Sequence, residues 1–396
     1  MRVQTEAGEL PREMGAYLCR VAARSDVFRR QLEGIPQDLD LAGFRRVPLA
    51  DRALLYRDIA EHPPMGSLYS SETARICFTP SPQGLIPVQH THADLEKIHA
   101  AICSILRTGG VNPGDRAAIT FGYHLFVAGL LFHGICDAMG VHALPLGPGE
   151  AARSAKIIND MDARLLIANP TFALQLAEHG ASAPKTLLLT GESMSFVPGL
   201  RERLKESYGQ SATILEMYGL AELGPVALEC PAHNGMHVFE EIHFAEVVDP
   251  DTGRVLDEGG TGELVLTPYA KDVPGVVRFR TGDLIRLERR PCACGRSLSL
   301  VGGVLGQTHQ GFKVKGVKLY TAAVRDFMTL LGIESWQVDI RQDNARDRLT
   351  LTVDAAGSDT LTRLPDQWQS RFLFKLDGLA CEASVRGRQA IHDHRA

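Results

Sequence analysis

Two short segments of the chain carry residue types that suit a nucleotide. Residues 216–222 (EMYGLAE) and residues 278–283 (RFRTGD) lie about sixty residues apart. The Tyr218 ring can lie against a base, the Glu222 carboxylate can bind a metal-coordinated phosphate, and the Asp283 carboxylate can accept hydrogen bonds from ribose hydroxyls. Together the segments predict a nucleotide site. The Tyr-Gly-x-x-Glu spacing alone is weak evidence, because it also occurs in ordinary surface turns.

Four further side chains have the chemistry of a zinc site. Cys230 and His237 lie seven residues apart, and Cys292 and Cys294 form a Cys-x-Cys pair. Three thiolates and one imidazole complete a tetrahedral zinc site with no open coordination position, so the predicted role is structural. The spacing is looser than that of a zinc finger, and the residues alone leave the metal open.

The composition excludes several classes of protein. The 396-residue chain is 44% apolar and 22% charged, which is typical of a soluble globular protein with one large and one small domain. Its net charge of −5, with both signs interspersed, argues against a nucleic-acid partner. The N-terminus has no apolar signal region, and the apolar run at residues 125–135 is about half of the roughly 20 residues that a membrane span needs. We therefore expect a cytoplasmic protein with no membrane partner.

The eight cysteines are too sparse for a disulfide scaffold. Those outside the predicted zinc cluster are interpreted as small core residues: Cys19, Cys77, Cys103, Cys136 and Cys381. His233 and His243, which lie near the cluster in the sequence, are interpreted as solvated surface residues.

Short β-rich runs alternate with helical patterns from about Cys77 to Leu189, beginning with a strand at residues 75–80 and a helix at residues 94–110. Such alternation predicts parallel βαβ units. The pattern continues to a strand at residues 212–219. The predicted nucleotide turn therefore follows a strand of a doubly wound α/β layer.

After Cys230 the strands alternate apolar and polar residues, which is typical of antiparallel sheet. Residues 301–306 (VGGVLG) form a glycine-rich joint, and beyond it the chain has the pattern of a small α+β domain that starts with a strand at residues 312–320. The predicted fold is α/β. It has a large N-terminal domain of parallel α/β layers plus an antiparallel sheet or barrel (residues 1–304), and a small α+β C-terminal domain on a hinge (residues 305–396).

Several distinctive motifs follow one another in a fixed order. They are VNPGDR, AITFGY, LTGES, YGLAE, GMH, GELVLT, RFRTGDL and CACGR, at residues 111–116, 118–123, 189–193, 218–222, 235–237, 262–267, 278–284 and 292–296. In order and wording they resemble the adenylate-forming ligases, and within them the phenylacetate-CoA ligase family most closely. The resemblance begins near residues 38–44 and extends to about Tyr320.

The resemblance implies roles for individual residues. Glu222 and Lys313 are the implied catalytic residues. The nucleotide would bind to Thr79, Ser81, Gly84, Gly191, Glu192, Ser193, Glu216, Met217, Tyr218, Gly219 and Asp283. The acid would contact Phe121, Tyr123, Leu125, Phe126, Gly219 and Ala221, and an aryl or arylacetyl group would suit such walls, although each aromatic could also be a core residue. Members of the family carry cysteines and a histidine where this chain has its Cys/His cluster, which favours zinc there.

The reaction implied by the family has two steps. A carboxylate attacks the α-phosphate of ATP to give an acyl-adenylate and pyrophosphate, and a thiol, usually that of coenzyme A, then displaces AMP. The implied cofactors are ATP, Mg²⁺ and structural Zn²⁺, with coenzyme A as acceptor. Transfer to an amine or a carrier-protein thiol is an alternative, and a homodimer is left open.

Three segments depart from the family pattern. Residues 78–87 (FTPSPQGLIP) contain prolines and no lysine where the family has a Ser/Thr/Gly-rich run that ends in Lys-Pro. Residues 306–310 (GQTHQ) stand in place of Gly-Arg-Thr-Asp-Asp, and residues 384–396 lack a Gly-Lys-x-Lys-Arg type of ending. These losses suggest slower adenylation, a changed mode of phosphate binding, or loss of the ATP half-reaction. The alternative function is therefore a catalytically reduced homologue that binds a nucleotide or acyl ligand as a partner protein in a biosynthetic pathway.

Overall fold

The chain forms two compact units in the computed structural model. The larger comprises Met1–Thr79 and Pro87–Thr308, and the smaller comprises Pro80–Ile86 and His309–Ala396. The division after Thr308 differs from the boundary after residue 304 that the sequence predicts, and a short segment distant in sequence joins the smaller unit. The structure describes residues 9–34, 39–81, 84–194, 199–250, 252–257, 260–273, 275–308, 311–320, 324, 327–328, 331–343, 346–354, 358–372 and 374–395.

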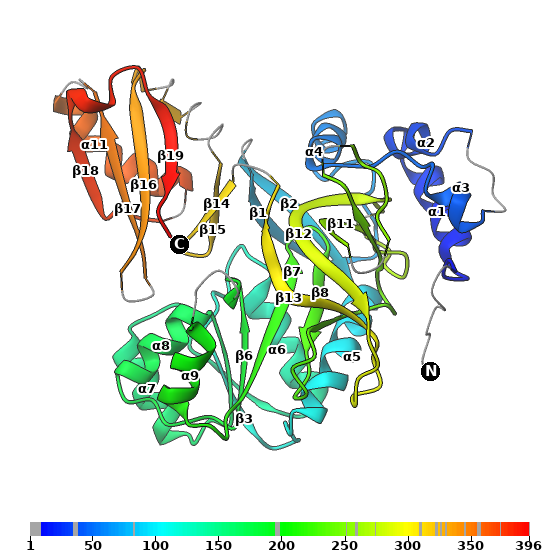
Figure 1. Ribbon diagram of the computed structural model, residues 1–396, viewed down its shortest axis with the longest axis horizontal. Coiled ribbons are helices and arrows are strands. Elements are labelled where there is room, and N and C mark those ends of the chain that lie inside the picture. Colours follow the sequence, from blue (N-terminus) through cyan, green and yellow to red (C-terminus); the bar gives the residue numbers. More distant parts are fainter. Residues whose placement is uncertain are drawn as a thin grey trace. The chain divides into compact units, whose positions relative to one another are not determined.

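One mixed sheet extends through the larger unit, with the strand order β10-β11-β12-β13-β9-β8-β7-β6-β5-β3-β4. Helices cover both faces of its parallel half, α5 and α6 on one side and α7, α8 and α9 on the other (Figure 1). Every residue of β5 and β6 is therefore buried, which explains their uninterrupted apolar runs. The parallel strands are β3 (Arg116–Ile119), β4 (His142–Pro145), β5 (Leu165–Ala168), β6 (Thr186–Thr190) and β7 (Thr213–Leu220). The helices are α5 (His92–Thr108), α6 (Ala128–Met139), α7 (Ala151–Asp160), α8 (Pro170–Glu178) and α9 (Leu200–Tyr208).

The sheet changes from parallel to antiparallel pairing at strand β7, which pairs in parallel with β6 and antiparallel with β8. From β8 to β10 every pairing is antiparallel, as the alternating pattern after Cys230 predicts. These strands are β8 (Gly224–Glu229), β9 (Met236–Val238), β10 (Phe244–Val248), β11 (Thr261–Thr267), β12 (Phe279–Arg289) and β13 (Leu298–Gln307).

Four short helices precede the sheet and pack against its antiparallel half, where their apolar residues share one core with β8 to β13. Tyr17 is fully buried there, and its hydroxyl donates to the Val276 carbonyl at 2.7 Å. No helix among the described residues is long and apolar enough to cross a bilayer. The four helices are α1 (Met14–Arg24), α2 (Asp26–Gln31), α3 (Leu41–Phe44) and α4 (Arg52–Glu61).

Two elements differ from the sequence prediction. The strand expected at residues 75–80 is part of a separate two-stranded sheet, β1 (Thr73–Ser81) with β2 (Gly84–Thr91), and does not join the α/β layer. The glycine-rich residues 301–306 lie within β13, where the pairing with β12 shifts register, so they form an irregular strand and not a joint. Glycines suit this irregularity because Gly302 and Gly303 both have positive φ.

The smaller unit is an α+β body with its own core. Its main sheet has the order β18-β17-β16-β19, and the indole side chains of Trp336 and Trp368 are fully buried beneath it. The expected single strand at residues 312–320 is a hairpin of two strands, β14 and β15. The elements are β14 (Gly311–Val314), β15 (Val317–Tyr320), β16 (Trp336–Asp343), β17 (Arg346–Val353), α11 (Ser358–Phe372), β18 (Gly378–Cys381), the 3₁₀ turn η2 (Ala383–Val385) and β19 (Gln389–Asp393).

Candidate functional site

The loops that carry most of the predicted site follow β3, β6 and β7. In the parallel half of the sheet the order is β7-β6-β5-β3. Carboxyl ends of parallel strands lie at the same edge, which is where open α/β sheets bind ligands. The fold therefore brings the predicted acid-binding loop after β3, the LTGES segment at the end of β6 and the YGLAE segment at the end of β7 to a common edge.

Asp283 of β12 is held by two side chains, one from β7 and one from β13. The Tyr218 hydroxyl donates to Oδ2 at 2.6 Å, and the Gln307 amide donates to Oδ1 at 2.9 Å. Asp283 and Gln307 are direct partners in the β12–β13 pairing, and Asp283 is buried. Burial and the neighbouring Asp283 carboxylate raise the pKa of Tyr218 well above its ordinary value. Gln307, identified in the sequence only as a departure from the family pattern, is thus part of the site.

Glu216 fastens the LTGES loop to β7. Its Oε1 accepts hydrogen bonds from the Ser193 hydroxyl at 3.1 Å and the Met194 backbone N–H at 3.0 Å. Burial, together with the nearby Glu229 carboxylate, raises the Glu216 pKa to about 7. Burial also opposes ionisation of Glu229, but hydrogen bonds from His233 and Arg201 hold the Glu229 pKa below its usual value. The negative charge of this pair therefore resides mainly on Glu229.

The carboxylate of Glu192 forms hydrogen bonds with residues at the start of α8. The Thr171 hydroxyl lies 2.8 Å from Oε2 and 3.0 Å from Oε1 and shares its one hydrogen between them, and the Asn169 amide donates to Oε1 at 3.3 Å. Both partners lie at the start of α8, so Glu192 anchors the loop to that helix. Gly191 has a φ of 92°, a backbone conformation that favours glycine.

Glu222 lies in the turn between β7 and β8 and forms an ion pair with Arg52 of α4. The Arg52 Nε lies 2.7 Å from Glu222 Oε1, and its Nη1 donates to the Thr281 carbonyl at 2.9 Å. Both side chains are largely buried: that of Arg52 is 14% exposed and that of Glu222 is 6% exposed. No pattern in the sequence identified Arg52, because it lies 170 residues from Glu222 and its neighbours are those of an ordinary amphipathic helix.

Four of the six predicted acid-binding residues share one irregular loop between β3 and α6, and Gly219 and Ala221 lie at the end of β7 and in the turn that follows it. Phe121 packs against Phe132 with ring centroids 5.5 Å apart, and the Tyr123 hydroxyl lies 3.2 Å from Nδ1 of His133. Phe126 is half-buried, whereas Leu125 is 44% exposed and has a positive φ.

Backbone contacts join this loop and the YGLAE turn to neighbouring strands. The Leu125 carbonyl accepts a hydrogen bond from the Phe78 N–H of β1 at 2.7 Å. At the YGLAE turn, a side chain at Gly219 would meet the Gly224 carbonyl at 3.0 Å. The neighbouring Met217 is buried, and its carbonyl accepts from the Thr190 hydroxyl, while Ala221 is half-buried.

The residues predicted to handle phosphate are divided between the two units. Thr79 is buried in β1 of the larger unit, whereas Gly84 and Lys313 belong to the smaller one. The side chain of Ser81 lies outside the described residues, as do His309 and Gln310 of the altered hinge. Residues 78–87 contain no lysine, and Ile86, which precedes Pro87 in β2, is buried.

The predicted metal cluster converges. Ligand atoms of Cys230, His237, Cys292 and Cys294 all lie within 4.8 Å of one another. Cys230 Sγ is 3.4 Å from His237 Nε2 and 3.6 Å from Cys292 Sγ. The Ser299 hydroxyl lies 2.9 Å from His237 Nδ1, which leaves Nε2 directed at the thiols. Burial raises the Cys230 thiol pKa to about 12, so the free thiol would hold its proton at neutral pH.

Three sequence interpretations of histidines and cysteines outside the cluster are wrong. His243 is buried, not solvated; its Nε2 lies 2.9 Å from the Pro225 carbonyl, and burial lowers its pKa to about 3. Cys19 and Cys381 are exposed, not core residues. The exposed His233 and the buried Cys77, Cys103 and Cys136 agree with expectation.

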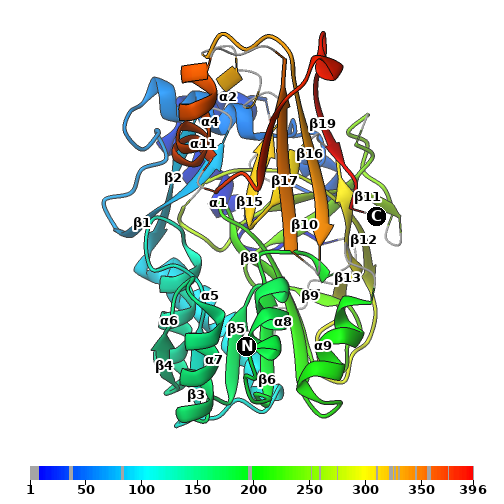
Figure 2. The same cartoon turned by 90° about the vertical axis from the view of Figure 1, so that its left-hand side faces the viewer.

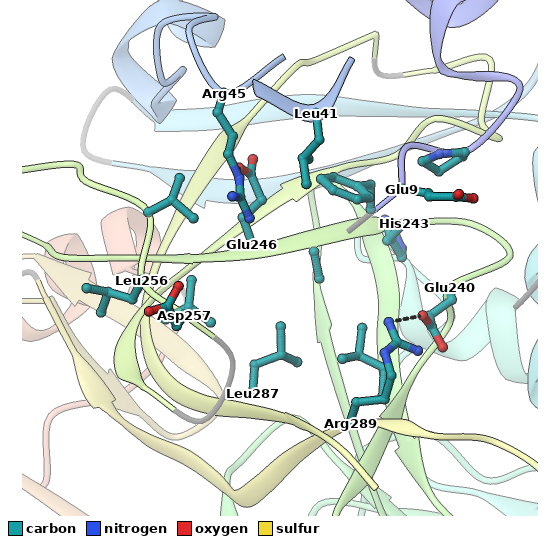
Figure 3. Close-up of a pocket in the computed structure, with 16 residues that line it drawn as sticks. Glu9, Leu41, Arg45, Glu240, His243, Glu246, Leu256, Asp257, Leu287 and Arg289 are labelled. Atoms are coloured by element: carbon teal, nitrogen blue, oxygen red, sulfur yellow. Dashed lines mark hydrogen bonds and ion pairs between the residues drawn. The ribbon is translucent and has the colours of Figure 1, made fainter. Parts of the chain in front are cut away.

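A cavity of about 230 Å³ opens elsewhere, in the antiparallel half of the sheet (Figure 3). Apolar residues such as Leu256 and Leu287 line it, and the ion pair between Glu240 and Arg289, 2.9 Å long, lies at its edge. None of the predicted nucleotide, acid or metal residues lines this cavity. It is distinct from the edge formed by the parallel strands.

No protein-family model matches the chain. The chain is similar to the phenylacetate-coenzyme A ligase of Thermus thermophilus, with 30% identity over 386 residues that cover 90% of this chain and 85% of the relative. It is 27% identical to the phenylacetate-coenzyme A ligase of Aromatoleum evansii, over 84% of this chain and 77% of that relative.

Among solved structures, the chain matches 2-hydroxyisobutyryl-CoA ligase in complex with 2-HIB-AMP and CoA. The TM-score is 0.86 at 22% identity, over 98% of this chain and 92% of that one. It also matches the amide bond synthetase McbA of Marinactinospora thermotolerans, with a TM-score of 0.59 at 17% identity, over 83% of this chain and 66% of that one. These likenesses establish a shared fold.

Proposed function

The chain belongs to the phenylacetate-coenzyme A ligase family, and we propose that it uses ATP to activate a carboxylic acid as an acyl-adenylate and then transfers the acyl group to coenzyme A. The relatives from Thermus thermophilus and Aromatoleum evansii are phenylacetate-coenzyme A ligases. The 2-hydroxyisobutyryl-CoA ligase that shares this fold was solved with an acyl-AMP and coenzyme A.

In the first step, a carboxylate oxygen of the acid forms a bond to the α-phosphorus of ATP, and the bond to pyrophosphate breaks. In the second, the thiolate sulfur of coenzyme A attacks the acyl carbon and AMP leaves with the electron pair of the broken C–O bond. The protein's part is mainly to position the reactants and to stabilise charge on the phosphates.

The observation that carries the proposal is the support around Asp283. A carboxylate that accepts ribose hydroxyls must be held in a fixed orientation, and here Tyr218 and Gln307 each donate to one of its oxygens. Glu216 ties the LTGES loop to the strand that carries Tyr218. The proposed adenosine site is therefore braced by side chains from β7, β12 and β13.

We propose that the acid is aromatic. Phe121 and Phe126 are both half-buried in the loop after β3, beside the edge where the adenylate would form. Half-buried aromatic rings in such a loop provide apolar walls for an aryl group. Lys313 is the proposed cation for adenylation, and the smaller unit would have to bring it to this edge.

For zinc, the donor set fits. Three thiols and an imidazole suit a tetrahedral structural site, and Ser299 already orients the His237 ring. Zinc would convert the buried Cys230 thiol to a thiolate and would join the end of β8 to the β12–β13 connection. Its role would be to stabilise the fold around the nucleotide site.

For magnesium, Glu222 is the proposed ligand, although it shares its carboxylate with Arg52. Replacing Glu222 with Gln should raise the Mg²⁺ concentration required for half-maximal activity by about tenfold or more. The exposed Glu206 of α9, changed to Gln, is the matched control. An unchanged Mg²⁺ requirement in Glu222→Gln would remove Glu222 from the metal site.

The direct test is acid-dependent exchange of pyrophosphate into ATP, measured over a panel of phenylacetate, benzoate and aliphatic 2-hydroxy acids. We expect exchange with an aromatic acid, loss of exchange in Asp283→Asn, and no change in Asp160→Asn on the surface of α7. A folded wild-type protein that exchanges with no acid in the panel would contradict the proposal.

The second candidate is a catalytically reduced homologue that binds nucleotide or acyl ligand as a partner protein. The Arg52–Glu222 ion pair favours it, because an arginine already neutralises the proposed magnesium carboxylate. The absence of a lysine from residues 78–87 favours it as well. Thermal stabilisation by AMP or ATP, without exchange and without thioester, would support this candidate.

The acceptor is tested separately. Release of AMP that requires coenzyme A, with formation of the thioester, would support the main proposal. AMP release that requires an amine or a carrier-protein thiol would instead identify that group as the acceptor. A cytoplasmic location and a homodimer stay predictions from the sequence.

A further inference from the structure

Two exposed histidines of the smaller unit lie beside a carboxylate. Strand β19 pairs in parallel with β16, with His392 opposite Asp339, and the two strands lie side by side in both views (Figures 1 and 2). His394, two residues further along, places its Nε2 2.7 Å from Asp339 Oδ1. One ligand atom from each of the three residues lies within 4.8 Å of the others. We propose that Asp339, His392 and His394 bind a divalent transition-metal ion, such as Zn²⁺ or Ni²⁺.

The strand geometry places all three side chains on one face. Side chains alternate along a strand, and the neighbours Val338 and Ile340 are fully buried in the core, so Asp339 points to the outer face. His392 and His394 are exposed. The His394 backbone N–H donates to the Ile340 carbonyl at 2.8 Å, which continues the β16–β19 pairing and fixes the position of the imidazole relative to Asp339.

A second layer of contacts orients the carboxylate. The Gln337 amide donates to Asp339 Oδ2 at 2.9 Å, and Arg388 in turn donates to Gln337 Oε1 at 2.9 Å. Oδ1 is thereby turned toward the histidines. Such outer contacts are typical of metal sites, where they fix the orientation of the first ligands.

The donor set selects the class of metal. Imidazole nitrogen suits Zn²⁺, Ni²⁺, Co²⁺ and Cu²⁺, whereas Mg²⁺ and Ca²⁺ prefer sites made of oxygen ligands alone. Two histidines and one carboxylate leave coordination positions for water. A bound ion would cross-link the C-terminal strand β19 to β16, in addition to the backbone pairing and the Asp339–His394 and Gln337–Arg388 contacts.

The test is metal binding by the full-length protein without a histidine tag, first loaded with Zn²⁺ at its cysteines and then titrated with Ni²⁺ by calorimetry. We expect about one Ni²⁺ per chain to bind. The variant His392→Ala/His394→Ala should lose that binding, and Gln337→Ala should weaken it by about tenfold. The control His142→Ala/His179→Ala removes two exposed histidines of the larger unit and should bind as the wild type does.

Co²⁺ separates this site from the cysteine cluster, because only thiolate ligands give a sulfur-to-cobalt charge-transfer band. Uptake of Co²⁺ without that band, abolished in Asp339→Asn, would support the proposal. Asp339→Asn keeps the shape of the side chain, so it serves if the double variant fails to fold. Ni²⁺ binding that persists in both variants, or a wild type that takes up no Ni²⁺ beyond its cysteine site, would overturn the proposal.

Discussion

Tyr218 and Gln307 together account for the environment of Asp283. Each donates to one carboxylate oxygen, so the orientation of this carboxylate depends on residues from two other strands. Local spacing identified Asp283 and Tyr218 but assigned the tyrosine only a ring for the base. The hydroxyl that holds Asp283 is a second role, visible only once β7 and β12 lie in one sheet.

Replacing Tyr218 with Phe should keep the ring and remove one hydrogen bond to a buried carboxylate. We expect a loss of about 1–2 kcal/mol in the free energy of unfolding and several-fold weaker AMP binding. Urea unfolding and a thermal-shift titration with AMP measure the two effects. Tyr69→Phe, at a 52% exposed tyrosine, should change neither. Equal stability of Tyr218→Phe and wild type would argue against a stabilising role for the contact.

Glu216 makes the stability of the protein depend on pH. Its pKa rises from 4.5 to about 7 because the carboxyl is buried and lies near Glu229. The folded state therefore holds a proton that the unfolded state releases, and stability should fall as the pH rises from about 4.5 to about 7.

The variant Glu216→Gln should remove this dependence, because it mimics the protonated form. Its free energy of unfolding, relative to wild type, should increase by about 3 kcal/mol between pH 4.5 and pH 8. Urea unfolding across that range measures the difference, with Glu206→Gln as the exposed control. A constant difference across the range would show that Glu216 titrates normally.

Both halves of the sheet contribute to the proposed site: the parallel half through the segments at the ends of β3, β6 and β7, and the antiparallel half through Asp283 and Gln307. The alternation of strands and helices predicted the parallel strands, because buried runs such as β6 leave few other structures possible. The β1–β2 sheet was not predicted. A Ser/Thr/Gly-rich run indicates a loop. Residues 78–87 instead contain apolar residues and prolines, which occur in edge strands as well as in loops.

The Cys/His cluster joins three elements, since Cys230 follows β8, His237 lies in β9 and Cys292 lies in the β12–β13 connection. We expect about one zinc per chain in native mass spectra of the purified protein. Cys292→Ser should lose it and unfold at a lower temperature. Cys19→Ser, an exposed cysteine of α1, should retain both the metal and the melting temperature. Wild-type protein that contains no zinc and in which the three cluster cysteines are free thiols would contradict this prediction.

At the scale of the whole molecule, the chain has two cores. The sequence contains 2 tryptophans, and both, Trp336 and Trp368, are buried in the smaller unit. Tryptophan fluorescence therefore reports on that unit alone, whereas AMP binding would report on the larger one.

Because the two cores are separate, we expect a destabilising substitution in one unit to leave the other unit folded. Trp368 packs against Phe372 with ring centroids 4.4 Å apart, so Trp368→Ala should destabilise the smaller unit by about 3–5 kcal/mol. The unfolding transition seen by Trp336 fluorescence should move to lower urea, while the AMP-dependent thermal shift stays as in wild type. A matched loss of AMP binding would show that the units are energetically coupled.

The sequence by itself determined the fold class, the family and the strand ends that carry the site. These follow from local patterns: hydrophobic periodicity sets the strands and helices, and short motifs set the turns between them. The sequence also identified the four side chains that converge in the Cys/His cluster, because thiol and imidazole groups suit a structural zinc site.

Only the tertiary structure decided which partners the site residues have. Arg52 neutralises Glu222 across 170 residues of sequence, and Gln307 reaches Asp283 because β13 pairs with β12 in one particular register. Neither contact leaves a local signal, since sheet register depends on packing of the whole sheet and not on the sequence near either residue. The same holds for Asp339 and His392, which become neighbours only when β19 pairs with β16.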